Sequence, residues 1–297
     1  MSAGFISFNN QIISRETPLF TVGNRSFRYG DGFFESMRIT GADLPFIKNH
    51  FQRIVDTAAT LELQLPHGFT ADQLKENVLQ LAEKNGIKGE GRARVNLYRN
   101  DGGLYAPIDN SCSIVIDVTT YEGGGLGYEL NSRGLKIELY QKIKKPCNAL
   151  SIIKSCNSLL YVLAGKFKTE QELDESVILN DKHNVCEFTS SNLFIVINGV
   201  LYTPSIAEGC IDGVMRKVIL ELASKARINV YETELKPNDL IRADEIFLTN
   251  AIQGVQWIGA YKTKRYFNKV SKILVDALNE HVAALKLQKE SRDRDNS

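Results

Sequence analysis

Two hydrophobic periods alternate along the chain, one typical of strands and one typical of helices. Within 91–99, Ala93, Val95 and Leu97 are apolar at every second position, which places them on one face of a strand. Residues 46–63 instead repeat apolar side chains every three or four positions, as an amphipathic helix does. The same patterns predict further strands at 33–39, 111–120, 134–141, 176–180, 193–197, 230–234 and 245–251, short strands within 5–24, and helices at 70–85, 159–168, 214–225, 239–243 and 268–287. Strands and helices mixed in this way predict an α/β (α+β) fold.

The glycine-rich stretch at 121–127 is the most linker-like part of the chain. A length of 297 residues suits two domains. We therefore expect an N-terminal α/β domain at 1–123, a linker at 124–133 and a C-terminal domain at 134–297.

Charged residues interrupt two of the predicted strands. In 33–39 the period of two places Phe34, Ser36 and Arg38 on one face, and Glu35 on the other face among apolar neighbours. We expect Glu35 or Arg38, or both, to form a cross-strand ion pair. In 91–99 the same period makes Arg99 the last residue of the apolar face. An inward-pointing arginine needs an anion, which is either a substrate carboxylate or a structural aspartate.

Lys154 follows the apolar β-branched pair Ile152 and Ile153 and precedes the predicted helix 159–168. An ammonium at the end of a buried strand loses hydration and needs compensation. Its chemical use is to form a Schiff base with an aldehyde. The alternative is a lysine that reaches out to water from a strand end.

Composition excludes several classes of function. A net charge of +1 gives no overall field for nucleic acid or an anionic membrane. Five scattered cysteines without a C-x-x-C pair predict reduced thiols and a cytoplasmic protein. Four histidines without ligand spacing argue against a metal site. We expect no signal peptide and no membrane-spanning segment, since no apolar run has the necessary length or flanks.

The second half of the chain contains the parts that a pyridoxal phosphate (PLP) site needs. Glu187 is an acid in an apolar context that could bind a protonated pyridine nitrogen. A phosphate could be bound by backbone N–H groups at Gly213-Val214-Met215 or at Thr249-Asn250. Each residue also has a structural alternative, as a turn carboxylate, a helix-entry glycine or a strand-end cap, but their joint occurrence favours the site.

Several blocks of the chain, from about Gly30 to about Ile258, resemble the class IV aminotransferases, which are PLP enzymes of fold type IV. This family includes branched-chain and D-amino-acid aminotransferases and aminodeoxychorismate lyase. The blocks are Tyr29-Gly-Asp-Gly-Phe-Phe-Glu35, the helix with Arg53, Ile153-Lys154-Ser-Cys-Asn157, Glu187-Phe-Thr-Ser-Ser191-Asn192-Leu-Phe, Gly213-Val-Met-Arg216, and Phe247-Leu-Thr-Asn250. The resemblance implies two α/β domains with PLP at their interface, in a homodimer.

The family pattern also implies a role for each matching residue. Lys154 is similar to the catalytic lysine that carries PLP, and Glu187 to the partner of the pyridine nitrogen. Arg53 is similar to an arginine that binds the cofactor phosphate. The remaining cofactor contacts implied are Ser191, Asn192, Ile211, Val214, Met215, Thr249 and Asn250, and the substrate contacts implied are Phe34, Ser36, Arg38, Arg99, Tyr105 and Ala251.

Departures from the family pattern bear on the reaction. Leu159 stands where branched-chain enzymes have a tyrosine. Met215 and Thr249-Asn250-Ala251 are closer to the lyase pattern, but the Gly-Arg-Gly-Tyr loop of the lyase is Gly102-Gly103-Leu104-Tyr105 here, and its arginine is absent.

The function we predict is a PLP-dependent transfer of an amino group between an amino acid and a 2-keto acid. The alternative is aminodeoxychorismate lyase, which releases pyruvate to form 4-aminobenzoate. A third reading is a non-catalytic protein with the same fold, against which the joint presence of Lys154, Glu187 and Arg53 argues. The sequence leaves open the donor, the acceptor, the stereochemistry and any assembly beyond a dimer.

Overall fold

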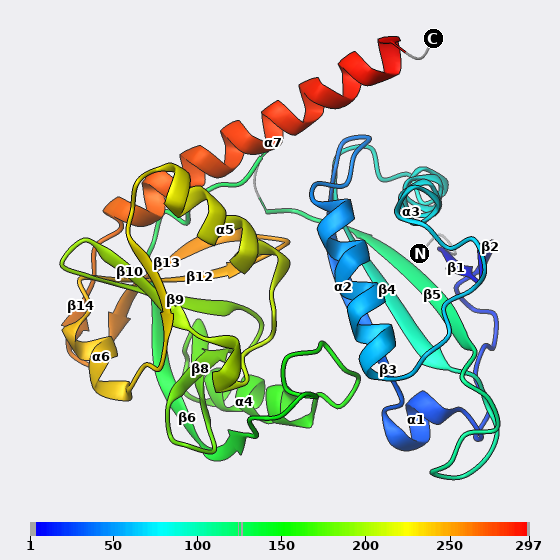
Figure 1. Cartoon of the computed structure of the whole chain (residues 1–297), viewed down its shortest axis with the longest axis horizontal. Helices are drawn as coiled ribbons and strands as arrows, with labels where there is room; N and C mark the ends of the chain where they lie inside the picture. The colour runs from blue at the N-terminus through cyan, green and yellow to red at the C-terminus, as the bar shows by residue number, and fades with distance from the viewer. Residues whose placement is uncertain (1–3, 124, 126, 296–297) are drawn as a thin grey trace. The chain divides into compact units, whose positions relative to one another are not determined.

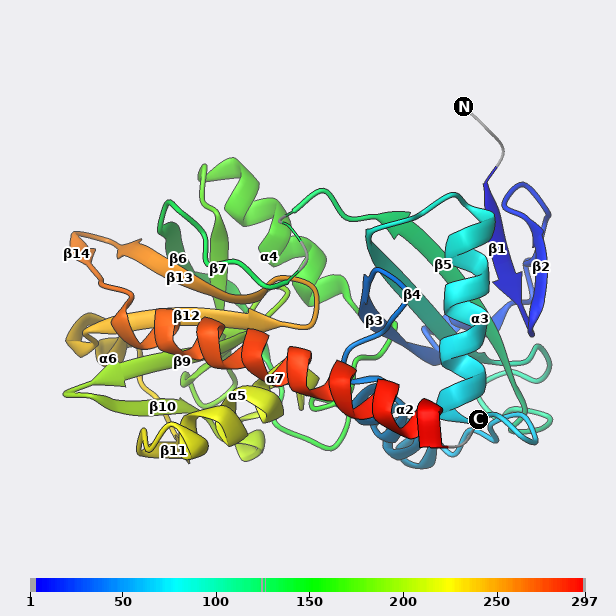
Figure 2. The ribbon, with the colours of Figure 1, turned by 90° about the horizontal axis from the view of Figure 1, so that it is seen from above.

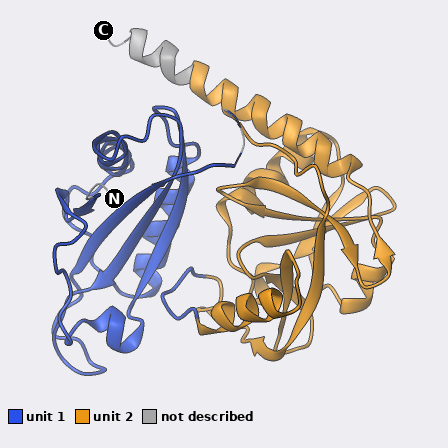
Figure 3. Ribbon diagram, turned by 180° about the vertical axis from the view of Figure 1, so that it is seen from behind, with its two compact units in different colours: residues 1–126, 153–158 blue, residues 127–152, 159–297 orange. Residues whose placement is uncertain are grey.

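The computed structural model describes residues 4–123, 125 and 127–295, with side chains described to residue 287. Contacts divide the chain into two compact units (Figure 3). Unit 1 comprises 1–126 and 153–158, and unit 2 comprises 127–152 and 159–297. The predicted boundaries at 123 and 134 stay a prediction, but this division adds one feature that they lack: the short segment around Lys154 packs with unit 1.

Unit 1 contains a five-stranded antiparallel sheet in the order β2-β1-β5-β4-β3 (Figure 1). Its strands are β1 (Phe5–Phe8), β2 (Gln11–Ser14), β3 (Gly32–Thr40), β4 (Glu90–Arg99) and β5 (Cys112–Thr120). In the register of β3 and β4, Phe34 pairs with Asn96, Ser36 with Arg94 and Arg38 with Arg92. One face of the sheet therefore carries a band of polar and charged side chains.

The opposite face of this sheet holds the core of unit 1. Helices α2 (Ile47–Thr60) and α3 (Ala71–Lys84) pack their apolar stripes against it. On β3 the core residues are Phe33, Met37 and Ile39, each at most 1% exposed. Burial of such side chains stabilises a fold by about 1.5–3 kcal/mol each. This core fixes which face of β3 the intervening residues occupy.

A short helix, α1 (Arg25–Tyr29), precedes β3 and is absent from the helices predicted from the sequence. The Asn24 side chain caps its first turn by accepting from the Phe27 N–H. Gly30 ends it with a φ of 66°, a left-handed conformation that glycine adopts without a Cβ clash. This single turn was too short for a periodicity signal.

Unit 2 is built on a mixed sheet in the order β11-β10-β9-β12-β13-β6-β7-β8, with β14 paired to β13. Its strands are β6 (Leu135–Lys145), β7 (Glu175–Asn180), β8 (Val185–Phe188), β9 (Asn192–Ile197), β10 (Val200–Pro204), β11 (Val230–Thr233), β12 (Glu245–Asn250), β13 (Gly254–Tyr261) and β14 (Lys264–Arg265). The turn at Asn198-Gly199, a dipeptide that favours tight hairpin turns, joins β9 and β10.

Helices α5 and α7 lie next to each other in unit 2 (Figure 2), where α5 also contacts β12 and α7 contacts β12 and β13. The helices of this unit are α4 (Leu159–Glu170), η1 (Ile206–Glu208, a 3₁₀ turn), α5 (Val214–Lys225), α6 (Pro237–Arg242) and α7 (Lys269–Asp295). The predicted helices are all present, although α7 extends beyond the expected end at 287. No helix in the described part of the chain is both long and apolar enough to cross a membrane.

Candidate functional site

Lys154 lies on the segment 153–158, which runs along β3 within unit 1. The Phe34 N–H donates to the Lys154 carbonyl at 3.0 Å, and the Cys156 N–H donates to the Gly32 carbonyl at 2.9 Å. Phe33 and Ser155 form an antiparallel bridge. These contacts hold Lys154 beside Phe34, with its Nζ 4.4 Å from the centre of the aromatic ring. Hydrogen bonds between the backbone of this segment and that of β3 therefore fix the position of Lys154.

Arg94 contacts the same aromatic ring from the neighbouring strand β4. Its Cζ lies 3.7 Å from the centre of the Phe34 ring, and its Nε donates to Asn96 Oδ1 at 3.1 Å. Burial is the main cause that lowers the pKa of this half-buried guanidinium. Among the described residues no carboxylate forms an ion pair with it. The sequence pattern gave no sign that Arg94 belongs to the site, because the period of two only places it on the face opposite Arg99.

Glu35 is 1% exposed on the core face of β3 and is held by two basic side chains. Arg53 Nε donates to Oε1 and Nη2 to Oε2, both at 2.7 Å, and His50 Nδ1 contacts Oε2 at 2.8 Å. Burial alone would raise the pKa of Glu35, but the charge of Arg53 and the hydrogen bonds from both side chains lower it to about 2. Burial also lowers the pKa of His50, which makes the neutral ring the hydrogen-bond donor here. Glu35 thus fixes the orientation of the Arg53 guanidinium.

Arg38 and Ser36 lie on the polar face of β3. Arg38 Nε donates to Glu90 Oε2 at 2.6 Å, and its guanidinium lies 5.2 Å from the ring centre of Tyr121. This is a cross-strand ion pair of the kind predicted for Glu35 or Arg38. Ser36 Oγ is 3.5 Å from an Arg92 nitrogen, a distance at the outer limit of a hydrogen bond.

Arg99 is surrounded by acceptors of unit 1 itself. Its Nε donates to both Asp31 oxygens, at 3.0 and 3.3 Å, and its terminal nitrogens donate to the carbonyls of Leu61 and Glu62 and to Asn110 Oδ1. The sequence left open whether Arg99 meets a substrate or a structural aspartate. In the structure the partner is a structural aspartate, Asp31.

The loop after β4 is held by Arg25, which is 3% exposed. Its guanidinium donates to the carbonyls of Gly102, Leu104 and Tyr105 and to Asp31. The Tyr105 side chain itself is 88% exposed, with its ring centre 5.3 Å from that of Tyr29. The backbone of this loop is fixed, while the predicted substrate residue points outward from unit 1.

Glu187 lies on β8 of unit 2 and is 2% exposed. Its Oε1 accepts from Lys145 Nζ at 2.5 Å and from the Tyr161 hydroxyl at 2.7 Å, and its Oε2 accepts from the Ile211 N–H at 2.9 Å. The sequence did not predict Lys145 and Tyr161 as residues of this site. No short-range pattern links them to Glu187, because they belong to other elements of the unit.

Ile211 connects Glu187 to the N-terminus of α5. Its carbonyl accepts from the Asn192 side chain at 2.7 Å. A Cβ on Gly213 would lie 1.9 Å from Asn192 Oδ1, so only glycine fits between this side chain and the helix. Val214 and Met215 then begin α5, and the first N–H groups of a helix have no intrahelical acceptor.

Thr249 pairs with Asn192 across β12 and β9 and therefore lies beside this helix start. Its hydroxyl is buried and has no hydrogen-bond partner among the described residues. Next to it, the Asn250 side chain donates to Ser191 Oγ at 2.9 Å, and the Ala251 carbonyl accepts from the Tyr128 hydroxyl. A buried hydroxyl without a partner, beside a helix N-terminus, suits a bound phosphate. The phosphate oxygens can accept hydrogen bonds from the hydroxyl and from the first N–H groups of the helix. Unit 2 thus offers a carboxylate for a ring nitrogen and donors for a phosphate, as PLP requires.

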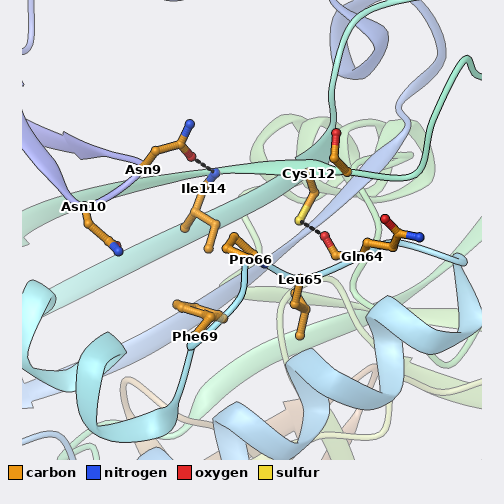
Figure 4. Close-up of a pocket in the computed structure, with 9 residues that line it drawn as sticks. Asn9, Asn10, Gln64, Leu65, Pro66, Phe69, Cys112 and Ile114 are labelled. Carbon is orange, nitrogen blue, oxygen red and sulfur yellow. Dashed lines mark hydrogen bonds between the residues drawn. The ribbon is translucent and has the colours of Figure 1, made fainter.

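None of the site residues described above lines the cavity shown in Figure 4. It has a volume of about 390 Å³ and lies in unit 1. Its walls are Asn9, Asn10, Gln64, Leu65, Pro66, Phe69, Ser111, Cys112 and Ile114. Burial raises the pKa of its one thiol, Cys112, to about 11, so that the thiol is not a nucleophile at neutral pH. The described side chains also form no cluster of three or more histidines, cysteines and acids that could bind a metal.

Comparison with known proteins gives a consistent result. The family model described as amino-transferase class IV matches residues 32–261. A protein of Methanocaldococcus jannaschii named putative branched-chain-amino-acid aminotransferase is 29% identical, over 82% of this chain and 83% of its own. Aminodeoxychorismate lyase of Vibrio harveyi is 27% identical, over 79% and 84%. A branched-chain aminotransferase of Thermoproteus uzoniensis, solved with norvaline, has a similar fold, with a TM-score of 0.83, 20% identity and coverage of 95% of both chains.

These matches confirm the predicted family resemblance and the predicted fold class. They also confirm an enzyme with PLP as its cofactor. Other solved branched-chain aminotransferases of this fold contain phosphopyridoxyl-glutamate or pyridoxamine phosphate. The roles of individual residues stay predictions.

Proposed function

Because the chain belongs to the class IV aminotransferases, we propose that it transfers an amino group between an amino acid and a 2-keto acid. Bound PLP supplies an aldehyde that condenses with amines and a ring that accepts electron density. The residues of this chain then bind the cofactor and substrate and move the proton.

The residues of unit 2 hold the cofactor in this proposal. Glu187 is the anionic partner of the ring nitrogen, and Ile211 packs beside it. The N–H groups of Val214 and Met215 and the hydroxyl of Thr249 bind the phosphate. The single observation that carries this assignment is the buried Thr249 hydroxyl without a protein partner, next to the start of α5. Asn250, Ser191 and Asn192 complete this region, and Arg53, oriented by Glu35, adds positive charge for the phosphate.

Lys154 is the residue that carries the cofactor and moves the proton through its Nζ. The chain itself ties this lysine to unit 2, since Ile152 is two residues away and two residues span about 7 Å at most. The Ile152 carbonyl accepts from the Asp212 N–H at 3.0 Å, directly after Ile211. Covalent connection therefore supports the assignment of Lys154 and Glu187 to one site.

Arg94 is our candidate for the substrate carboxylate, in place of Arg99. A guanidinium binds a carboxylate through two parallel hydrogen bonds. Arg94 and Lys154 contact the same ring, so Cζ and Nζ lie no more than about 8 Å apart. Phe34, Ser36, Arg38, Tyr105 and Ala251 remain the other proposed substrate contacts.

The decisive experiment is a titration of the PLP-loaded protein with single amino acids, without a keto acid, followed by absorption. Conversion of the bound cofactor to its pyridoxamine form by one amino acid supports transamination and identifies the donor. In Lys154→Ala we expect covalent attachment of PLP to be lost and turnover to fall on the order of 10²–10⁴-fold or more. Lys142→Ala, an exposed lysine on β6, is the control. Normal turnover in Lys154→Ala would contradict the proposal.

Aminodeoxychorismate lyase is the second candidate, because Met215 and Thr249-Asn250-Ala251 follow its pattern. The loop Gly102-Gly103-Leu104-Tyr105 argues against it, since the arginine of the lyase loop is missing there. If no amino acid converts the cofactor, release of pyruvate from aminodeoxychorismate is the assay that promotes this candidate.

We also propose a cytoplasmic homodimer. Unit 1 exposes large apolar side chains, of which Val22, Phe27 and Ile108 are each at least 77% exposed. Exposed apolar surface of this kind is typical of a protein interface. The five cysteines are free thiols, which suits a reducing compartment. Light scattering of the purified protein tests the dimer, and a monomer mass at micromolar concentration would refute it.

A further inference from the structure

Lys145 is a buried cation that the proposed reaction does not use. It ends β6, its side chain is 5% exposed, and its Nζ donates to Glu187 Oε1 at 2.5 Å. The carbonyl of the same residue accepts from the Asp181 N–H, which holds the strand end in place. A buried ammonium and a buried carboxylate each cost several kcal/mol in lost hydration, so each depends on the other for compensation.

Tyr161 is the second donor to the same oxygen. It lies on α4, and its hydroxyl is 2.7 Å from Glu187 Oε1. Lys145 Nζ also lies 5.4 Å from the centre of its ring. Burial, and then the charge of Glu187, raise the pKa of Tyr161 well above its usual range, so the hydroxyl keeps its proton and remains a donor.

The donors are distributed unequally over the two oxygens of Glu187. Oε1 has two side-chain donors, one of them charged, whereas Oε2 has only the Ile211 N–H among the described residues. A carboxylate oxygen can accept more than one hydrogen bond, so Oε2 retains capacity for a further donor. A ring nitrogen that carries a proton is such a donor.

We propose that Lys145 and Tyr161 are positioning residues for Glu187: the charge of Lys145 keeps the carboxylate ionised, and both side chains fix its Oε1, so that Oε2 is available to a protonated ring nitrogen. The role of Oε2 in binding the cofactor rests on the proposed function. The effect of Lys145 on the charge of Glu187 does not, because it can be measured in the protein without PLP.

The first experiment compares the charge state of Glu187 in cofactor-free variants at pH 7.5. Infrared difference spectra against Glu187→Gln isolate the signal of this carboxyl group. We expect a carboxylate in the wild type and in Lys145→Arg, and a protonated acid in Lys145→Met. Lys142→Met, on the exposed part of β6, is the matched control and should resemble the wild type. A carboxylate in Lys145→Met would overturn the proposal.

If Lys145→Met does not fold, Lys145→Gln takes its place in the infrared experiment. The glutamine amide can still donate a hydrogen bond to Oε1 but carries no charge. A protonated Glu187 in this variant supports the proposal, and a carboxylate overturns it. Tyr161→Phe should leave the carboxylate ionised. Tyr140→Phe, a buried tyrosine of the same cluster, is its control for packing.

The second experiment measures PLP affinity by fluorescence titration. A charge-assisted hydrogen bond is about 1–1.5 kcal/mol stronger than a neutral one, which corresponds to about tenfold in Kd. We expect a roughly tenfold weaker Kd in Lys145→Met, a few-fold weaker Kd in Tyr161→Phe, and little change in Lys145→Arg and Tyr140→Phe. Equal PLP affinity in Lys145→Met and the wild type would reduce Lys145 to a structural role and overturn the proposal.

PLP binding by the wild type and the charge state of Glu187 are measured independently. If the wild type itself binds no PLP, the proposed function is wrong, and the infrared result still decides whether Lys145 controls Glu187. If the wild type binds PLP and the infrared signals of the Lys145 variants do not differ, the proposed function stands and the positioning role is wrong.

Discussion

Each unit of the protein buries one carboxylate against a positive charge, but the two sites differ in what they leave open. In unit 1, Glu35 receives a two-pronged contact from Arg53 and a third contact from His50, so both oxygens face strong side-chain donors. In unit 2, Glu187 receives its two side-chain donors on one oxygen and a single backbone N–H on the other.

In the function proposed above, this difference separates a structural carboxylate from one that binds the cofactor. Glu35 has side-chain donors on both oxygens, and in the proposed function it acts through the orientation of Arg53. Glu187 has side-chain donors on Oε1 alone, and its Oε2 accepts from a backbone N–H. Burial alone therefore does not distinguish the two, since both are at most 2% exposed. The distribution of donors does.

The largest effect that tests this comparison is expected from Glu35→Gln. It leaves Arg53 and His50 without a buried negative charge, and breaking a buried ion pair costs about 3–5 kcal/mol. Urea unfolding of the cofactor-free protein measures it, with Glu83→Gln, an exposed acid on α3, as the control. A loss below about 1 kcal/mol, as for an exposed pair, would show that Glu35 is not the structural anchor described here.

The pH dependence of stability should show the same ion pair. The pKa of Glu35 is lowered from 4.5 to about 2, so its stabilising contribution is complete above pH 4.5 and disappears as the pH falls towards 2. A shift of this size corresponds to roughly 3 kcal/mol. His50, with its lowered pKa, adds a loss that begins near pH 6.5, because the unfolded ring takes up a proton that the folded one resists.

Unfolding free energies between pH 7 and pH 3 measure this dependence. Glu35→Gln should flatten the part below pH 4.5. An unchanged slope in that variant would assign the acid sensitivity to other groups.

A smaller effect is expected at Arg94, which forms no ion pair with a carboxylate of the described residues. Arg94→Leu should raise KM for the amino acid by about 10–100-fold, because a hydrogen bond to a charged group contributes about 1.5–3 kcal/mol. Arg92→Leu, its exposed neighbour on β4, is the control. Steady-state kinetics that show equal KM values for both variants would remove Arg94 from the substrate site.

The smallest effect on stability should come from Thr249→Val, and it should have the opposite sign to that of Glu35→Gln. Replacing a buried hydroxyl that has no partner removes a cost of about 1–3 kcal/mol, so the cofactor-free protein should become slightly more stable. PLP affinity should fall by about tenfold as the phosphate loses a donor. Thermal unfolding without PLP and a PLP titration give the two measurements. A variant that loses stability without PLP would mean that the hydroxyl has a protein partner.

The sequence by itself determined which face of a strand its residues occupy. The period of two placed Glu35 and Arg99 on the core face, and the structure finds both there, at 1% and 7% exposure. It also determined the family, because the motif around Lys154 and the block from Glu187 to Asn192 are local and contiguous. Local patterns suffice for these features, since they depend on neighbours one to four residues apart.

Only the tertiary structure decided which partner each buried charge takes. Arg99 meets Asp31 across 68 residues, Glu187 meets Lys145 across 42, and Arg94 stacks on Phe34 from another strand. A periodic pattern states that a charge is buried but not which distant element packs against it. Hydrogen bonds act over about 3 Å in space, whatever the separation along the chain, so the chemistry of each carboxylate is settled only when the strands and helices come together.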